Sequence, residues 1–183
     1  MGKRLEPMLN TYLQNRFTVV IGNSAKGIDL PENTINTDIK VTSLKQPQSS
    51  CPFKNARQKI YGLGYNLLVF VYEKIDTQDT CTLRFVYCTF INKERTADYT
   101  TSKRIIEMLN DGANREDILS FFQDKGIPGD EITLSEIADE VLRNTPMQGY
   151  LTISNALQWR LQYQRVITLN DKIPGITNYE WIF

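Results

Sequence analysis

The chain has 183 residues, of which 41% are hydrophobic and 23% are charged. This length and composition predict a globular protein with one solid core, or a core with a smaller appended module. No run of eighteen apolar residues occurs, and Glu6 and Asn10 are polar where a signal peptide needs an apolar stretch. We therefore expect a cytoplasmic protein that does not enter a membrane.

The residue types that are absent exclude several kinds of active site. The chain contains no histidine, and its three cysteines do not form a CxxC motif. Without histidine, Ser-His-Asp catalysis, Cys-His catalysis and His-ligated zinc are all excluded. The cysteine pattern argues against a disulfide framework or a zinc finger. Any hydrolytic chemistry must therefore depend on carboxylates, lysine and a metal ion.

The formal net charge is zero, yet the charges are unevenly distributed along the chain. Residues 73–140 hold fifteen acidic and eight basic residues, which leaves six acidic and thirteen basic residues elsewhere. Segments 39–72 and 141–170 contain basic residues and no acid. Such segments could contact DNA phosphates on either side of an active site, although scattered basic residues also serve only to keep a protein in solution.

Residues 3–14 have the apolar spacing of an amphipathic helix. Glu6 lies beside the middle of the apolar stripe of this helix. It is either a solvated carboxylate of the first turn, which the helix dipole favours, or a third acid of a metal site. The sequence pattern leaves both interpretations open.

The candidate chemistry lies around Asp29 and Asp38. Residues 38–41 alternate polar and apolar side chains, which predicts a strand with Asp38 and Lys40 on the same face. Proline and asparagine residues separate Asp29 from this strand and are typical of a turn. A hairpin of this length can fold Asp29 back beside Asp38.

Two such carboxylates, together with the main-chain carbonyl of Ile39, would form an all-oxygen site suited to Mg²⁺. Lys40 would then hold or activate an attacking water. The alternative is that Asp29, Asp38 and Lys40 are ordinary solvated surface charges, because Asp-x-Lys pairs are common on strands.

This pattern resembles the catalytic core of the PD-(D/E)XK nuclease superfamily, the fold of most type II restriction endonucleases and of many repair and recombination nucleases. Asp29 matches the first Asp of the motif, and Asp38-Ile39-Lys40 matches its second half. The chain departs from the motif at Ile28, where the motif name has proline. The resemblance covers roughly the first half of the chain.

The resemblance implies Mg²⁺-dependent hydrolysis of double-stranded DNA, with Mn²⁺ as a substitute for Mg²⁺. It implies catalytic roles for Asp29, Asp38, Lys40 and Glu6, with Asp29, Asp38 and Ile39 as metal ligands. A sequence-specific enzyme is expected to act as a homodimer, since each strand then meets one active site. The alternatives are a nuclease that cuts by DNA structure, and a DNA-binding protein whose nuclease-like core is inert.

The elements after the motif predict an α/β fold. Residues 55–63 have helical spacing, residues 66–72 form the apolar run of a central strand covered on both faces, and residues 82–91 predict the next strand. We therefore expect a mixed central β-sheet flanked by helices, built from residues 1–99.

Residues 100–183 are expected to form a second region with three helices and two strands. The predicted helices and strands, in that order, cover residues 102–109, 115–125, 134–142, 149–153 and 163–169. This order resembles a helix-turn-helix unit with a β wing that reads DNA. The alternative is a helical elaboration that packs on the core.

The expected DNA contacts are basic, amide or hydroxyl side chains in the two segments that lack acids. They are Lys45, Gln46, Gln48, Ser49, Lys54, Arg57, Arg160 and Arg165. Residues 42–50 are expected to be a polar loop beside the catalytic strand. Residues 154–165 are the preferred base-recognition segment, because amide and guanidinium groups pair with adenine and guanine. A generic surface loop and a solvated polar helix are the respective alternatives.

Overall fold

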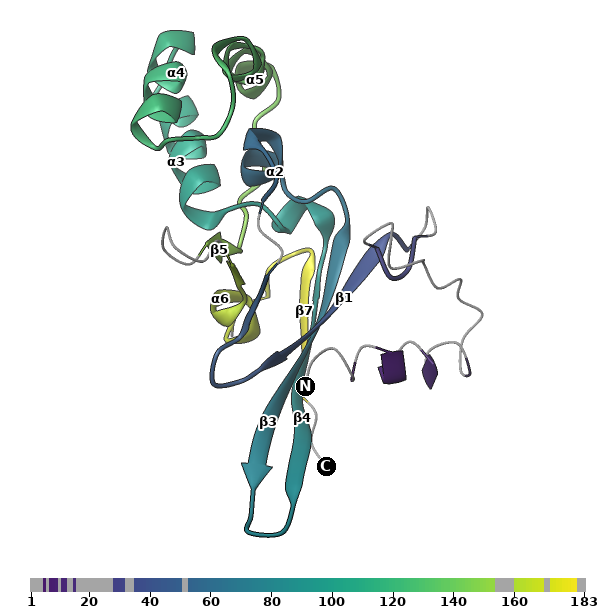
Figure 1. The fold of residues 1–183 in the computed structure, drawn as a ribbon. Helices are drawn as coiled ribbons and strands as arrows, with labels where there is room; N and C mark the ends of the chain where they lie inside the picture. The colour runs from purple at the N-terminus through teal and green to yellow at the C-terminus, as the bar shows by residue number, and fades with distance from the viewer. Residues whose placement is uncertain are drawn as a thin grey trace.

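A computed structural model describes residues 5, 7–9, 11–12, 15, 28–31, 35–50, 53–153, 160–169 and 172–180. At its centre is a four-stranded mixed sheet of order β1-β3-β4-β7 (Figure 1). The strands are β1 (Thr37–Ser43), β3 (Asn66–Asp76), β4 (Cys81–Ile91) and β7 (Ile176–Glu180). Strand β1 is parallel to β3, and the other pairs are antiparallel. The predicted mixed α/β fold is confirmed.

A second, smaller sheet has the order β2-β6-β5 and is antiparallel throughout. Its strands are β2 (Gln48–Ser49), β5 (Thr152–Ile153) and β6 (Leu161–Gln162). Because β2 follows β1 closely, this sheet brings the chain around residue 160 next to the end of β1.

One helix lies in the connection between β1 and β3, and three others gather around it. The helix bounds are α2 (Ala56–Tyr61), η2 (Lys93–Arg95), α3 (Tyr99–Asn110), α4 (Arg115–Asp124), α5 (Glu131–Arg143) and α6 (Gln164–Ile167). Helix α2 lies in the crossover that a parallel β1–β3 pair requires, and Asn55 caps it as a hydrogen-bond acceptor for the N–H of Gln58. Helices α3, α4 and α5 gather around α2 at one end of the molecule (Figure 1).

Strand β3 is covered on both faces, as its continuous apolar sequence predicts. Leu67, Val69 and Val71 are at most 1% exposed and pack in a cluster with residues of α6. Phe70 faces the opposite side, where it packs with Leu30 and Ile39. Residues 67–71 of β3 are therefore covered by apolar side chains on both faces, and β1 lies at the edge of the sheet.

Two predictions about local structure are wrong. Residues 163–169 do not form a strand, because Gln164–Ile167 is the short helix α6. Tyr163, which directly precedes this helix, is buried together with Val166 and Ile167. These residues are three and four positions apart, a spacing that one helical turn places on the same side. Residues 42–50 are also not simply a loop, since β1 continues to Ser43 and β2 begins at Gln48.

Part of the expected N-terminal helix is described, and its residues 5, 7–9, 11–12 and 15 are helical. Glu6 and residues 154–159 of the preferred base-recognition segment lie outside the described residues. Within the described part of the chain, no helix is long and apolar enough to cross a membrane.

Candidate active site

The candidate active site is built on the edge strand β1. Alternation along this strand places Asp38 and Lys40 on one face, as the sequence predicts. Nζ of Lys40 lies 2.6 Å from Oδ2 of Asp38. Asp38 is only 3% exposed, so this ion pair is largely shielded from water.

Asp29 reaches the same strand through a short antiparallel bridge. Leu30 and Thr37 exchange two main-chain hydrogen bonds of 2.9 Å, which close the hairpin between them. The carboxylate Oδ2 of Asp29 then accepts a hydrogen bond of 2.8 Å from the N–H of Ile39. The structure therefore brings together Asp29, Asp38 and Lys40.

The pKa of Asp38 reflects this crowded position. Burial raises it from 3.8 to about 6, the Lys40 ammonium opposes the rise, and a hydrogen bond and the charge of Asp29 add to it. Burial and the neighbouring Asp29 carboxylate disfavour the charged form of Asp38, and neutralisation by a cation favours it. A divalent cation between Asp29 and Asp38 would supply that neutralisation.

Two asparagines hold the hairpin that carries Asp29. The amide of Asn66 donates to the carbonyl of Ile35 at 2.8 Å, and its oxygen accepts from the N–H of Lys93 at 2.9 Å. The N–H of Asn66 donates to the carbonyl of Asn36 at 2.8 Å. The Asn36 amide donates to Gly64 at 3.0 Å, and Asn36 has a positive φ of 33°, a conformation that asparagine tolerates better than most residues. The hydrogen bonds of Asn36 and Asn66 thus hold the turn that precedes β1 against the start of β3.

The candidate metal ligands among the described residues meet part of what a hard divalent cation requires. Asp29 and Asp38 supply carboxylate oxygens, the ligand type that Mg²⁺ prefers. The Ile39 N–H points to Asp29, and the C=O of a strand residue points to the same side as its N–H. Ile39 itself is fully buried. Among the described residues, no group of three or more Asp, Glu, Cys or His forms a metal site, so a third acid is not found there.

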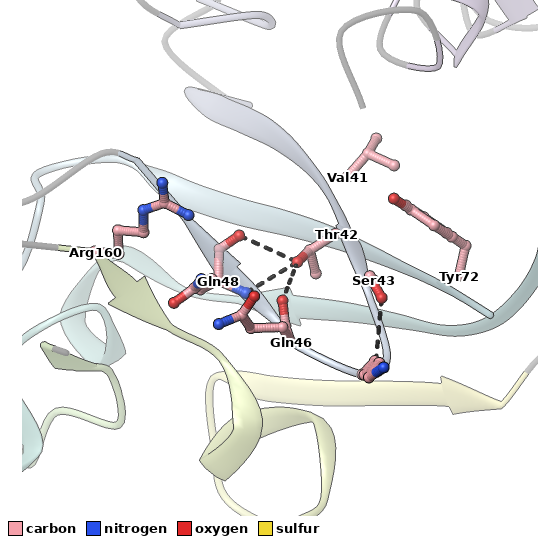
Figure 2. A pocket seen from close by; sticks show the side chains of 8 residues that line it. Val41, Thr42, Ser43, Gln46, Gln48, Tyr72 and Arg160 are labelled. Atoms are coloured by element: carbon pink, nitrogen blue, oxygen red, sulfur yellow. Dashed lines mark hydrogen bonds between the residues drawn. The ribbon is translucent and has the colours of Figure 1, made fainter. Parts of the chain in front are cut away.

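Four of the expected DNA-contact residues line one cavity of about 560 Å³ at the end of β1. They are Lys45, Gln46, Gln48 and Arg160, which share the cavity with Thr42 and Tyr72. Figure 2 shows Gln46 and Gln48 grouped around the hydroxyl of Thr42. The contributions of Thr42 and Tyr72 were not predicted, because both lie in strands whose pairing decides which residues meet.

The other four expected DNA-contact residues lie elsewhere. Oγ of Ser49 is hydrogen-bonded to the Tyr163 hydroxyl at 2.6 Å, and Lys54 is exposed just before α2. Arg57 pairs with Glu140 of α5 at 2.5 Å. The guanidinium carbon of Arg165 lies 3.7 Å from the ring centre of Tyr99. Arg57 and Arg165 thus have partners within the chain.

Comparison with known proteins identifies the family of this chain. A family model described as "Type II restriction enzyme NspV" matches residues 1–178. The type II restriction enzyme NspV of Nostoc sp. (strain ATCC 29411 / PCC 7524) is 51% identical over 178 residues, which cover 96% of this chain and 80% of that relative. No solved structure gives a significant match. The chain therefore belongs to the type II restriction enzyme NspV family.

Proposed function

We propose that the chain is a sequence-specific endonuclease of the PD-(D/E)XK superfamily, which hydrolyses phosphodiester bonds of double-stranded DNA with Mg²⁺. The observation that carries this proposal is the hydrogen bond of 2.8 Å from the Ile39 N–H to Asp29 Oδ2. It joins the two halves of the motif, which the sequence separates by nine residues. Family membership supplies the activity, and this contact supports the assignment of residues to it.

In this proposal, Asp29 and Asp38 hold the metal ion, with the Ile39 carbonyl as a further ligand. Bound Mg²⁺ would neutralise the scissile phosphate and lower the pKa of a water molecule; Mn²⁺ would substitute. The pKa of Asp38, raised by burial to about 6, leaves the carboxylate ionised at neutral pH and ready to bind a cation. The hydrogen bond from the Ile39 N–H fixes Asp29 for the same purpose.

Lys40 is assigned to the attacking water and the phosphate charge. Its side chain is 19% exposed, whereas the side chain of its partner Asp38 is only 4% exposed. Lys40 therefore lies between the buried Asp38 carboxylate and solvent, from which DNA must approach. A cation there would orient the water and stabilise negative charge that develops on the phosphate. Glu6 remains the proposed third acid.

Duplex cleavage needs one active site for each strand, and we propose a homodimer that supplies two copies of this site. The DNA contacts proposed for each subunit include the eight residues expected from the sequence. Lys45, Gln46, Gln48 and Arg160 have the strongest support, because they share a cavity beside the catalytic strand. An enzyme that cuts DNA must meet its substrate, which supports the cytoplasmic location.

Digestion of several plasmids of known sequence tests this function. The wild-type protein with Mg²⁺ or Mn²⁺ should give discrete fragments, with 5′-phosphate and 3′-hydroxyl ends. Asp38→Ala and Lys40→Ala should abolish cleavage and leave DNA binding intact. A wild-type protein that never cuts DNA with either metal would overturn the proposal.

The chain offers a matched control for these variants. Lys74 and Asp76 form an ion pair of 2.5 Å with the same two-residue spacing on a strand, but both are exposed on the β3–β4 hairpin. Lys74→Ala and Asp76→Asn should therefore cut DNA at the wild-type rate. If these variants lose activity as Asp38→Ala does, the loss does not depend on the candidate active site.

A further inference from the structure

We propose that the cavity at the end of β1 is the subsite that reads base-pair edges of the DNA, two to four base pairs from the cut. This inference rests on the proposed function, because it needs the scissile phosphate to lie at Asp38 and Lys40. It assigns sequence reading to Gln46, Gln48 and Arg160.

The chemistry of the cavity suits bases. Its lining includes two glutamine amides, one guanidinium group and one ammonium group, and it contains no carboxylate. Glutamine pairs bidentately with adenine, and arginine pairs bidentately with guanine. Amide side chains also contact phosphates, but two amides beside one guanidinium group match the bidentate pairing that reads adenine and guanine edges.

The glutamines are held in place by the catalytic strand itself. Thr42, which is 5% exposed, accepts a hydrogen bond of 2.9 Å from the N–H of Gln48 through its Oγ1. The same hydroxyl lies 3.3 Å and 3.1 Å from the carbonyl oxygens of Gln46 and Gln48 (Figure 2). One side chain of β1 therefore organises the backbone that presents both glutamines, before any ligand binds.

Arg160 is brought to the cavity by a separate contact. Gln48 and Ser49 of β2 pair with Gln162 and Leu161 of β6, and Arg160 directly precedes β6. A hydrogen bond of 2.8 Å from the Tyr163 N–H to the carbonyl of Pro47 fixes the same junction. The Thr42 hydrogen bonds therefore place Gln46 and Gln48 at the cavity, and the pairing of β2 with β6 independently places Arg160 there.

The strand also sets the distance between reading and cutting. Thr42 lies two residues after Lys40 and four after Asp38 on the same face. At a rise of about 3.3 Å per residue, the cavity starts roughly 7 Å from Lys40 and roughly 13 Å from Asp38. Base pairs are spaced about 3.4 Å apart, so the bases read there lie roughly two to four pairs from the scissile phosphate.

Cleavage of a set of duplexes tests this assignment. The wild-type cut site is first mapped, and each base pair of the site is then replaced singly. Gln46→Ala, Gln48→Ala and Arg160→Ala should each lose roughly five- to a hundredfold of the wild-type preference at a base pair within that distance. Discrimination at the remaining base pairs should be unchanged.

Controls separate base reading from other effects. Gln123→Ala removes an exposed glutamine of α4 outside the cavity and should keep the wild-type specificity. Thr42→Val should lose discrimination at the pairs that Gln46 and Gln48 read, and Thr42→Ser should restore it. An equal loss on every duplex, no loss at all, or relaxation only at more distant pairs would overturn the assignment.

The same experiment distinguishes this inference from the proposed function. If the wild-type protein cuts and Asp38→Asn does not, the active site stands whatever the glutamine variants do. If Asp38→Asn cuts as fast as the wild-type protein, the reference point for the distance is lost and both proposals fail.

Discussion

The Oδ2 atom of Asp29 accepts a hydrogen bond of 2.8 Å from the main-chain N–H of Ile39, ten residues further along the chain. This contact places the first carboxylate at the strand that carries Asp38 and Lys40. The hairpin that makes it possible is held by Asn36 and Asn66, which do not themselves reach the candidate metal ligands.

Removal of the Asn66 amide should weaken the metal site without abolishing it. Asn66→Ala loses the hydrogen bonds to Ile35 and Lys93, so Asp29 should be held less firmly. Groups that orient metal ligands typically contribute about 10- to 100-fold in metal affinity or activity. The Mg²⁺ concentration for half-maximal cleavage should therefore rise by about tenfold or more.

Asn110→Ala provides the comparison for this variant, because Asn110 is an exposed residue at the end of α3. Its Mg²⁺ dependence should match that of the wild-type protein. Equal Mg²⁺ dependence for Asn66→Ala and Asn110→Ala would show that Asn66 does not position the site.

Cleavage should decline as the pH falls through about 6. Burial raises the pKa of Asp38 to about 6, and only the ionised carboxylate binds a cation. Protons and Mg²⁺ then compete for Asp38, so a higher Mg²⁺ concentration should move the midpoint of the pH–rate profile to lower pH. A midpoint that does not depend on Mg²⁺ would contradict a role for Asp38 in metal binding.

Asp38 should also destabilise the metal-free fold at neutral pH. Its pKa is raised to about 6 in the folded protein, above its ordinary value of 3.8, so the folded state binds the proton more tightly. The free energy of unfolding should therefore fall as the pH rises from about 4 to 6, by about 3 kcal/mol from this group, and then stay level.

Asp38→Asn removes that dependence. At pH 8 without metal, it should be more stable than the wild-type protein, and the difference should shrink towards pH 4. Urea unfolding of both proteins at several pH values measures this. A variant that is less stable than the wild-type protein at pH 8 would contradict the burial penalty.

Lys45 should contribute to DNA affinity and not to specificity. Its side chain is exposed beside the cavity and carries a point charge suited to phosphate. Lys45→Ala should weaken binding about equally for all duplexes and reduce the slope of log affinity against log salt by about 1. Lys125→Ala, in the acidic helical part, should leave the slope unchanged. A change of specificity in Lys45→Ala would instead indicate a base contact.

The proposed homodimer can be tested by the DNA product of dimers that combine one wild-type and one inactive subunit. When wild-type and Asp38→Asn subunits are combined, the mixed dimers carry one working active site and should nick supercoiled plasmid without linearising it. Light scattering should give a mass of about 42 kDa, twice that of the 21.1 kDa chain. A mass of one chain, free or bound to DNA, would contradict the dimer.

Much of the fold follows from local patterns in the sequence. The apolar run of β3, the helical spacing of residues 55–63 and the alternation that puts Asp38 and Lys40 on one face are all local signals. The structure contains these local conformations because they are compatible with the tertiary packing. The division of the chain at residue 99 stays a prediction.

Contacts between distant segments could not be read in this way. β7 pairs with β4 although about ninety residues separate the paired positions, and Asn66 meets Ile35 across 31 positions. Arg160 reaches the cavity only because β2 and β6 pair. Local propensity contains no information on such partners, since the pairing is decided by the packing of the whole core.

Single-turnover cleavage of one mapped site by Asp29→Asn tests the central claim most directly, because Asp29 joins the site only through the folded hairpin. Its rate should fall by more than about a hundredfold, the upper range for groups that merely orient ligands, while DNA binding persists and Asp76→Asn cuts normally. An Asp29→Asn protein that cuts at the wild-type rate would contradict the convergence of Asp29 and Asp38 on one metal ion.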